Sequence, residues 1–248
     1  MNQVLDIADN IATVQERIAS ACDRVGRDPS EIMLVAISKK MPAEHILEAI
    51  SAGLTDFGEN RVEEALSKIP DVMARADAPV RWHMVGHIQS RKARDVVRLN
   101  FDMVHSVDSL KLAERLNNIA EAAGRSIPIL LEMNVSGEEA KSGWDAHEVL
   151  KSETISADLR NDIEAMSQFE HLSIQGLMTM APLVQNAEAT RPVFQALAAL
   201  RAVLRSEFPA LGWPHLSMGM TNDYEVAIEE GARIVRIGRA IFGERPRT

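Results

Sequence analysis

The feature that most constrains this sequence is an alternation of short apolar runs with amphipathic helical patterns, repeated along most of the 248 residues. The runs are apolar on both faces, as in Leu34-Val35-Ala36-Ile37, which is typical of parallel strands covered by helices. The predicted strands are Ile32–Ser38, Asp56–Glu59, Arg81–Gly86, Met103–Val107, Ile127–Val135, Leu172–Met180, His215–Met220 and Arg233–Ile237. The predicted helices between them are Ala43–Ala52, Arg61–Ile69, Arg91–Arg98, Ser109–Ala123, Asp145–Phe169, Arg191–Phe208 and Asp223–Glu230.

Eight strands that alternate with helices predict an α/β fold, a single-domain (β/α)8 barrel of the TIM type. A doubly wound open sheet would produce the same alternation, and this pattern alone does not decide between the two architectures. No linker rich in Gly, Pro or Ser divides the chain, so we expect one domain over residues 1–248. The longest segment expected to be irregular is Gly137–Ile155.

Residues 1–27 precede this alternation and predict an additional N-terminal helix that packs on the barrel. Its apolar residues recur three, four or seven positions apart, with charged residues between them. Asp6 and Asp9 interrupt what would have to be the apolar region of a secretory signal. No apolar stretch is long enough to span a bilayer. We therefore expect a cytoplasmic protein that does not contact membranes.

Charge and cysteine content narrow the class of function. The chain has 36 acidic and 27 basic residues, a net charge of −9, which argues against a general nucleic-acid binder. The single cysteine, Cys22, excludes an intramolecular disulfide and a cysteine-rich zinc site. No cluster of His, Asp and Glu has the spacing of metal ligands, so we expect no metal. The nucleophile-elbow and P-loop motifs are also absent from the sequence.

Functional residues of a barrel lie where its strands end, and the first predicted strand runs directly into Lys39. Period-two alternation places Lys39 on the same face as Val35 and Ile37. If that face is the barrel interior, Lys39 places an amine at the mouth of an apolar well. Burial lowers the pKa of an amine, and a free amine attacks a carbonyl to form a Schiff base. The alternative is that Lys39 and Lys40 are both solvated loop residues.

The last two strands point to a phosphate-containing ligand. Arg236 lies inside the apolar run Ile234–Ile237 and needs an acceptor, supplied by a salt bridge to a neighbouring strand or by a ligand. The turns 217–223 and 238–243 each lead into a helix, and barrels often bind phosphate in these two loops. Further polar residues at strand ends fit a pocket wall, and they are Glu59, Asn60, His83, Asn134 and Thr179. For His83 the alternative is a position in the core.

Six segments carry a resemblance to a known family. They are Leu34-Val-Ala-Ile-Ser-Lys39, Phe57-Gly-Glu-Asn60, Trp82-His-Met-Val-Gly86, Asn134-Val-Ser-Gly-Glu-Glu-Ala-Lys-Ser-Gly143, Gly176-Leu-Met178, and Ser217-Met-Gly-Met220 through Val235-Arg-Ile-Gly238. Together they resemble the pyridoxal phosphate homeostasis protein family, single-domain relatives of the alanine racemase N-terminal barrel. The similarity runs in consistent order from about residue 5 to residue 243.

The resemblance implies the cofactor and the residues that bind it. Lys39 would form the internal aldimine with pyridoxal 5′-phosphate, Lys40 would be its outward neighbour, and Arg236 would face the pyridine nitrogen. The phosphate would lie against Ser217, Met218, Gly238 and Arg239, with Thr221 capping the adjacent helix. Asn60, His83 and Asn134 complete the expected cofactor-binding set.

Three positions depart from the family pattern. Thr221 stands where relatives commonly have Ser, which keeps a hydroxyl. Arg239 stands where many have Thr, so a backbone N–H or the guanidinium must replace a hydroxyl contact to the phosphate. Arg91 stands where Asn is frequent, which leaves the role of that loop open.

An arginine at the pyridine nitrogen favours a carrier over an enzyme. It keeps that nitrogen unprotonated and weakens the ring as an electron sink. Racemisation also needs a second acid/base, which in the racemases is a tyrosine from a second domain of the partner subunit. The only tyrosine here is Tyr224, in the helix after the seventh strand.

We therefore expect a monomeric, non-enzymatic protein without catalytic residues. It would hold pyridoxal phosphate on Lys39 for vitamin B6 homeostasis and hand the cofactor to apo-enzymes. One alternative is a low-activity amino-acid racemase with Lys39 as its sole base. The other is a phosphosugar-type barrel enzyme in which Lys39 forms a Schiff base with its substrate.

Overall fold

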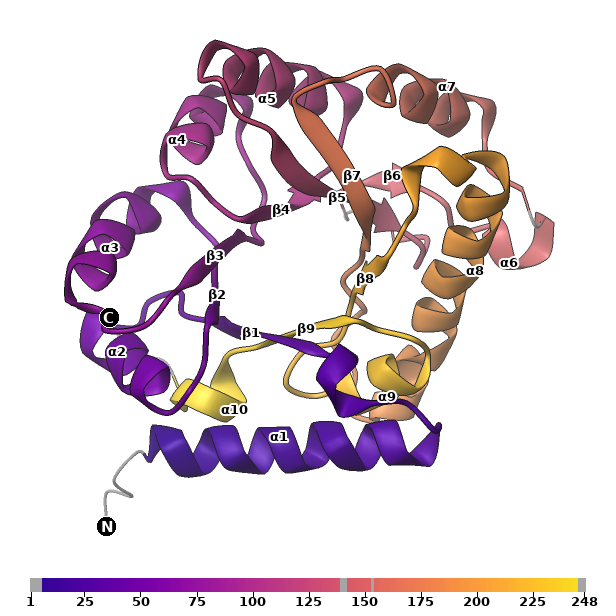
Figure 1. The fold of residues 1–248 in the computed structure, drawn as a ribbon. Helices are drawn as coiled ribbons and strands as arrows, with labels where there is room; N and C mark the ends of the chain where they lie inside the picture. The colour runs from indigo at the N-terminus through magenta and orange to yellow at the C-terminus, as the bar shows by residue number, and fades with distance from the viewer. Residues whose placement is uncertain (1–5, 139–141, 153, 245–248) are drawn as a thin grey trace.

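The apolar runs form strands that are buried between the barrel interior and a ring of helices (Figure 1). The computed structural model describes residues 6–138, 142–152 and 154–244. The strands are β1 (Met33–Ile37), β2 (Asp56–Glu59), β3 (Arg81–Met84), β4 (Met103–Val107), β5 (Ile127–Asn134), β6 (Trp144–Asp145), β7 (Leu172–Met178), β8 (His215–Ser217) and β9 (Ile234–Ile237). The helices are α1 (Ile7–Arg24), α2 (Ala43–Ser51), α3 (Val62–Arg75), α4 (Ala93–Arg98), α5 (Leu110–Ala122), α6 (Val149–Ser152), α7 (Ala157–Met166), α8 (Arg191–Glu207), α9 (Tyr224–Glu229) and α10 (Arg239–Phe242).

The sheet is a closed parallel barrel, which decides between the two architectures that the alternation allowed. Its strand order is β4-β3-β2-β1-β9-β8-β7-β5, and pairing of β4 with β5 closes the ring. The two-residue strand β6 adds to β5 outside that ring. In the β1–β9 register Val35 pairs with Arg236, which brings the end of β1 beside the end of β9.

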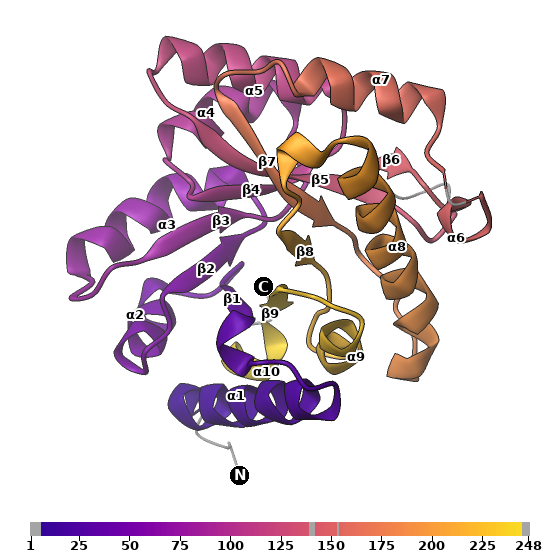
Figure 2. The ribbon, with the colours of Figure 1, turned by 45° about the vertical axis from the view of Figure 1, so that its right-hand side comes forward.

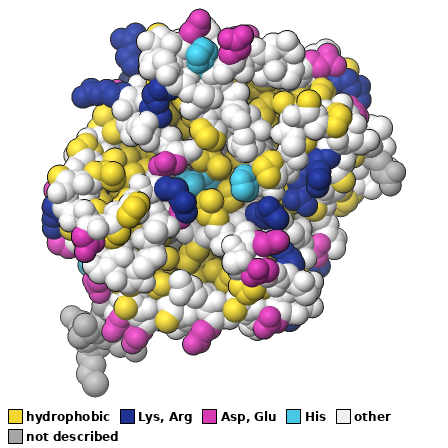
Figure 3. All heavy atoms as spheres, viewed as in Figure 1, with side chains coloured by type: hydrophobic (Ala, Val, Ile, Leu, Met, Phe, Trp, Pro, Cys, Tyr) yellow, Lys and Arg dark blue, Asp and Glu magenta, His cyan; other side chains and the backbone are white. Residues whose placement is uncertain are grey.

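The barrel interior has an apolar part and a polar part. Val35, Met103, Leu130, Met178 and Ile234 form a small buried cluster of their own, separate from the larger core between strands and helices. Val35 therefore faces the barrel interior, which was the condition for Lys39 to lie at the mouth of an apolar well. Polar and charged side chains also gather near the centre of the face shown in Figure 3, where histidines lie beside cationic and acidic groups.

Helix α1 packs on the outside of the barrel, across α9 and α10 (Figures 1 and 2). Its buried stripe includes Ile7, Ile11 and Ile18, and Asp6 caps its start by accepting the Asp9 N–H at 3.0 Å. The predicted N-terminal helix is therefore confirmed, with residues 1–5 of the predicted range outside the described residues. No described helix combines the length and the apolar character that crossing a bilayer requires.

The predicted helix Asp145–Phe169 is wrong as a single element, because it contains β6, α6 and α7. Between α6 and α7 the Ser152 hydroxyl accepts the Thr154 N–H at 3.4 Å, and the Ser156 hydroxyl caps α7 by accepting the Leu159 N–H at 3.2 Å. Such local side-chain bonds to the backbone compete with a continuous helix. Helix α3 extends beyond the predicted end at Ile69 and includes Pro70.

Candidate functional site

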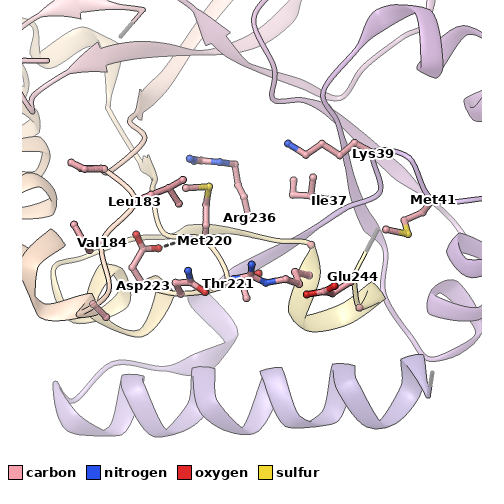
Figure 4. A pocket seen from close by; sticks show the side chains of 16 residues that line it. Ile37, Lys39, Met41, Leu183, Val184, Met220, Thr221, Asp223, Arg236 and Glu244 are labelled. Atoms are coloured by element: carbon pink, nitrogen blue, oxygen red, sulfur yellow. Dashed lines mark hydrogen bonds between the residues drawn. The ribbon is translucent and has the colours of Figure 1, made fainter. Parts of the chain in front are cut away.

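A cavity of about 410 Å³ opens where β1 and β9 end (Figure 4). Five of the ten predicted site residues line it, and they are Lys39, Thr221, Arg236, Gly238 and Arg239. The other lining residues are Ile37, Met41, Pro182, Leu183, Val184, Ala187, Met220, Asn222, Asp223, Gly243 and Glu244. The cavity thus combines an amine and two guanidinium groups with an apolar wall.

The amine of Lys39 extends over the cavity (Figure 4), whereas Lys40 is exposed and does not line it. The Met41 N–H donates to the Ser38 carbonyl at 3.0 Å, which closes a tight turn. Lys40 has a φ of 63°, a left-handed conformation that favours glycine and costs an L-residue roughly 1–2 kcal/mol. Because Lys39 is half-buried and Lys40 is exposed, the solvated-loop interpretation fits Lys40 and not Lys39.

A buried ionic network holds this turn from behind. Lys68 Nζ donates to Glu59 Oε1 and to the Ser38 carbonyl, each at 2.8 Å, and it also pairs with Glu64. Ser38 Oγ donates to Glu59 Oε1 at 2.6 Å, and Glu64 accepts the backbone N–H of Lys40. Burial raises the pKa of Glu59 and the Lys68 ammonium opposes that rise. Both residues that flank Lys39 are therefore bonded to the same network.

Arg236 is a buried cation that lines the cavity with 5% of its surface exposed. Its Nη1 donates to Ser217 Oγ at 2.6 Å and its Nη2 to the Thr179 carbonyl at 2.9 Å. Among the described residues no carboxylate lies within ion-pair distance of it, so the interstrand salt bridge considered as an alternative is not found there. Burial lowers the pKa of Arg236 to about 10, which leaves it charged at neutral pH.

The turns after β8 and β9 form the third part of the cavity. The backbone N–H groups of Thr221, Asn222 and Arg239 have no hydrogen-bond acceptor within the described part of the chain. Arg239 Nη2 donates to Asn222 Oδ1 at 2.7 Å, and Thr221 Oγ1 accepts the Ala240 N–H at 3.5 Å, so the two turns are joined. Backbone N–H donors without an acceptor, next to a guanidinium, are suited to bind an anion.

Gly219 lets the turn after β8 pack closely against α9. Its φ is 91°, and an added Cβ would lie 2.6 Å from the Ala227 Cβ and 2.9 Å from the Tyr224 Cα. Any other residue would therefore push the turn away from α9.

Two of the predicted ligands, Ser217 and Met218, do not line the cavity. The side chain of Met218 is fully buried in the core, and its N–H already donates to the Ile234 carbonyl at 3.1 Å. Ser217 is bonded to Arg236 and lies 2.9 Å from His105 Nδ1. Ser217 thus contacts the cavity only through Arg236.

The remaining three predicted residues also lie outside the cavity lining. His83 is buried in the barrel interior between Asp56 and His105. The amide of Asn134 donates to the Glu138 carbonyl at 2.9 Å and thereby folds the loop after β5. Asn60 is half-buried directly after β2. Residues 139–141 of the quoted Asn134–Gly143 segment lie outside the described residues.

The sequence pointed to the turn 217–223 but did not single out Met220, Asn222 or Asp223 as site residues. Asp223 Oδ1 fixes this turn by accepting the Met220 N–H at 2.6 Å (Figure 4). Leu183, 90% exposed at the cavity mouth, carried no periodic signal. Glu132 does not line the cavity, but its position between Leu131 and Met133 does carry a sequence signal, because an isolated charge in an apolar strand marks a buried polar position.

Glu132 makes the stability of the protein pH-dependent. The side chain is 4% exposed, and burial together with Asp108 raises its pKa to about 7, against the opposing charges of Arg236 and His87. Its carboxyl is therefore protonated in the folded state at pH values where the unfolded chain ionises it. The stability linked to Glu132 is present below the unfolded pKa and is lost as the pH rises through about 7.

We expect Glu132→Gln to be close to neutral at pH 5 and to raise the free energy of unfolding by roughly 2–3 kcal/mol at pH 8. Urea denaturation at both pH values measures the difference, with the exposed Glu121→Gln as a matched control that stays within about 0.5 kcal/mol at both. An effect of Glu132→Gln that is the same at pH 5 and pH 8 would contradict a raised pKa for the Glu132 carboxyl.

Comparisons with known proteins locate the whole chain in one family. A profile of the family described as "Alanine racemase, N-terminal domain" matches residues 7–246. The "Pyridoxal phosphate homeostasis protein" of Pseudomonas aeruginosa is 42% identical over 239 residues, which cover 96% of each chain. Its counterpart in Escherichia coli is 37% identical over 240 residues, which cover 97% of each chain.

Solved structures agree with these relatives. The structure of PipY from Synechococcus elongatus with PLP bound is 37% identical and has a TM-score of 0.80, covering 96% of this chain and all of that one. An alanine racemase from Clostridium difficile has a TM-score of 0.69 at 12% identity, covering 94% of this chain and 60% of the enzyme. At that identity the second likeness concerns the fold alone.

Proposed function

The chain belongs to the pyridoxal phosphate homeostasis protein family, and from that premise we propose that it binds pyridoxal 5′-phosphate through a Schiff base with Lys39. It would hold the reactive aldehyde for vitamin B6 homeostasis and pass it to apo-enzymes, without strong turnover of its own. The observation that carries this proposal is the convergence of Lys39, Arg236 and the turns at 221–222 and 238–239 on one cavity.

The donor set of the cavity fits the three polar parts of this cofactor. The dianionic phosphate suits the N–H groups of Thr221, Asn222 and Arg239 and the Arg239 guanidinium. The pyridine nitrogen is an acceptor, which suits a guanidinium donor from Arg236. The aldehyde carbon would form a C=N bond with Lys39 Nζ and release one water. The apolar wall of Ile37 and Met220 suits the ring.

Two features of the site support a carrier over a racemase. Arg236 stays cationic, so a pyridine nitrogen facing it would stay unprotonated and the ring would stabilise a carbanion poorly. The only tyrosine in the sequence, Tyr224, is buried in α9, with Arg17 of α1 over its ring at 5.4 Å from the centroid. It does not line the cavity and is not placed to act as the second acid/base.

The test is to load the protein with pyridoxal phosphate, remove free cofactor by gel filtration, and record the visible spectrum before and after borohydride. We expect a yellow protein whose visible absorbance disappears on reduction. The loaded protein is then incubated with single-enantiomer alanine in D₂O, and chirality and α-deuterium incorporation are followed. We expect less than about one exchange event per protein molecule over hours, against roughly 1–10³ per second for a typical enzyme.

Each result separates the candidate functions. Sustained racemisation or exchange would replace the carrier by an amino-acid racemase with Lys39 as its base. A protein that remains colourless would contradict cofactor binding and favour the barrel enzyme that forms its Schiff base with a phosphosugar.

A further inference from the structure

A continuous chain of hydrogen-bonded side chains runs through the barrel from Arg236 to Asp56. Arg236 Nη1 donates to Ser217 Oγ at 2.6 Å, and Ser217 Oγ lies 2.9 Å from His105 Nδ1. His105 Nε2 lies 3.0 Å from His83 Nδ1, and His83 Nε2 lies 3.0 Å from Asp56 Oδ1. Each of these five residues is at most 5% exposed.

This chain of hydrogen bonds connects the two ends of the barrel. Asp56 is the first residue of β2, where a second cavity opens at the N-terminal ends of the strands, and Arg236 lines the cavity at the C-terminal ends. His105 on β4 and Ser217 on β8 belong to strands that are not neighbours in the ring, so their contact crosses the barrel interior.

The two end groups give the chain a direction. Arg236 can only donate, and Asp56 is an ionised acceptor. Burial raises the pKa of Asp56, but the hydrogen bonds from His83 and Arg81 hold that pKa well below its usual value. Burial above all, with the nearby charge of Arg236, lowers the pKa of His105 far below its usual value, so this ring is neutral.

A neutral His105 allows two arrangements of protons. In one, Ser217 donates to His105, His105 to His83, and His83 to Asp56. In the other, His105 donates to Ser217 and His83 must be a cation, and the Ser217 hydroxyl proton then has no acceptor among its contacts in the described structure. A buried hydroxyl without an acceptor is costly, so the first arrangement is favoured.

We propose that Asp56, His83, His105 and Ser217 are positioning residues that fix the guanidinium of Arg236 at the cavity through this directed chain. The hydrogen bonds to Ser217 and Thr179 use two of the five N–H groups of Arg236, which leaves donors for a ligand in the cavity. Aligned hydrogen bonds strengthen one another, so the distant Asp56 carboxylate contributes to holding a cation that has no ion pair in the described structure. The effect on pyridoxal phosphate rests on the proposed function, whereas the effect on Arg236 does not.

The first test uses the cofactor-free protein and ¹⁵N NMR of its histidine rings at pH 7.5. We expect His83 and His105 both to carry their proton on Nε2, with Nδ1 as the acceptor. A proton on Nδ1 of His105 would overturn the proposal, because Ser217 would then be the acceptor at both of its contacts. This measurement needs no variant and no bound ligand.

The second test compares Asp56→Asn with Arg81→Gln. Both variants remove the Asp56–Arg81 ion pair, in which Arg81 Nη2 and Asp56 Oδ2 are 2.6 Å apart, but only Asp56→Asn removes the anionic end of the chain. We expect the rotation of the Arg236 guanidinium, measured by NMR in the cofactor-free protein, to accelerate about tenfold in Asp56→Asn and to change less than about twofold in Arg81→Gln. Equal effects in the two variants would mean that Asp56 acts only through its ion pair.

The bound cofactor gives a third readout. We expect the dissociation constant of pyridoxal phosphate to rise about tenfold in Asp56→Asn and in Ser217→Ala, which interrupts the chain next to Arg236, and to stay within about twofold in Arg81→Gln. If the wild-type protein binds no pyridoxal phosphate, the proposed function fails, but the NMR results still decide the positioning role. If Asp56→Asn does not fold, Ser217→Ala and the wild-type ring protonation decide it.

Discussion

Lys39→Ala is expected to abolish the covalent attachment of pyridoxal phosphate, whereas Lys40→Ala is expected to retain it. Both residues are lysines of one tight turn, but only Lys39 lines the cavity. After borohydride reduction, intact-mass spectrometry should show about one adduct per molecule for the wild type and Lys40→Ala, and background for Lys39→Ala. Peptide mapping of the wild-type adduct should place it on Lys39.

The outcome for Lys40 is the more demanding part of this prediction, because Lys40 is the next residue in sequence, is exposed and carries the same amine group. Thermal unfolding of both variants provides the control for folding, and we expect transition temperatures within a few degrees of the wild type. A reducible adduct that persists at full yield in Lys39→Ala would assign the aldehyde to a different amine and remove the main support for the proposed function.

Lys68→Met is expected to cost about 3–5 kcal/mol of stability at pH 8, because it leaves the buried carboxylate of Glu59 without its cation. The cost should be smaller at pH 5. Burial already raises the pKa of Glu59, and without Lys68 that pKa rises further, so the folded state protonates the carboxyl as the pH falls. Urea denaturation at both pH values measures the difference.

Two further variants serve as controls for Lys68→Met. Lys151→Met removes an exposed partner of Glu148, at 3.2 Å, and should cost less than about 1 kcal/mol, as is usual for exposed ion pairs. Combining Lys68→Met with Glu59→Gln removes both buried charges and should recover part of the loss. A single Lys68→Met variant as stable as Lys151→Met would show that the network contributes little to the fold.

The fold could be predicted from sequence because strands such as β1 and β5 are covered on both faces and are mostly apolar on both. Eight short runs separated by helical patterns then leave few architectures. The prediction failed at 145–169, where hydroxyl groups at Ser152 and Ser156 end one helix and begin another. The spacing of apolar residues that predicts a helix carries no information about such local hydrogen bonds.

The site could be predicted only in part. Lys39 and the turn that holds Arg239 follow from strand ends and alternation, and Arg236 from a charge inside an apolar run, because these patterns depend on neighbours in sequence. The resemblance implied that Met218 contacts the phosphate, but its side chain is buried in the core, and Met220 is the first residue after β8 that lines the cavity. The contact between His105 and Ser217 joins residues 112 positions apart, and no pattern within one strand indicates it.

The position of α1 has a consequence for the order in which the protein assembles. The Asn10 amide donates to the Ile241 carbonyl at 2.9 Å across 231 residues, and Arg17 pairs with Glu225 of α9. During synthesis the first helix must wait for the last strand and its two turns before it has a surface to dock on. The cavity is built on those same turns, so it is complete only after β9 and the turn that follows it have been synthesised.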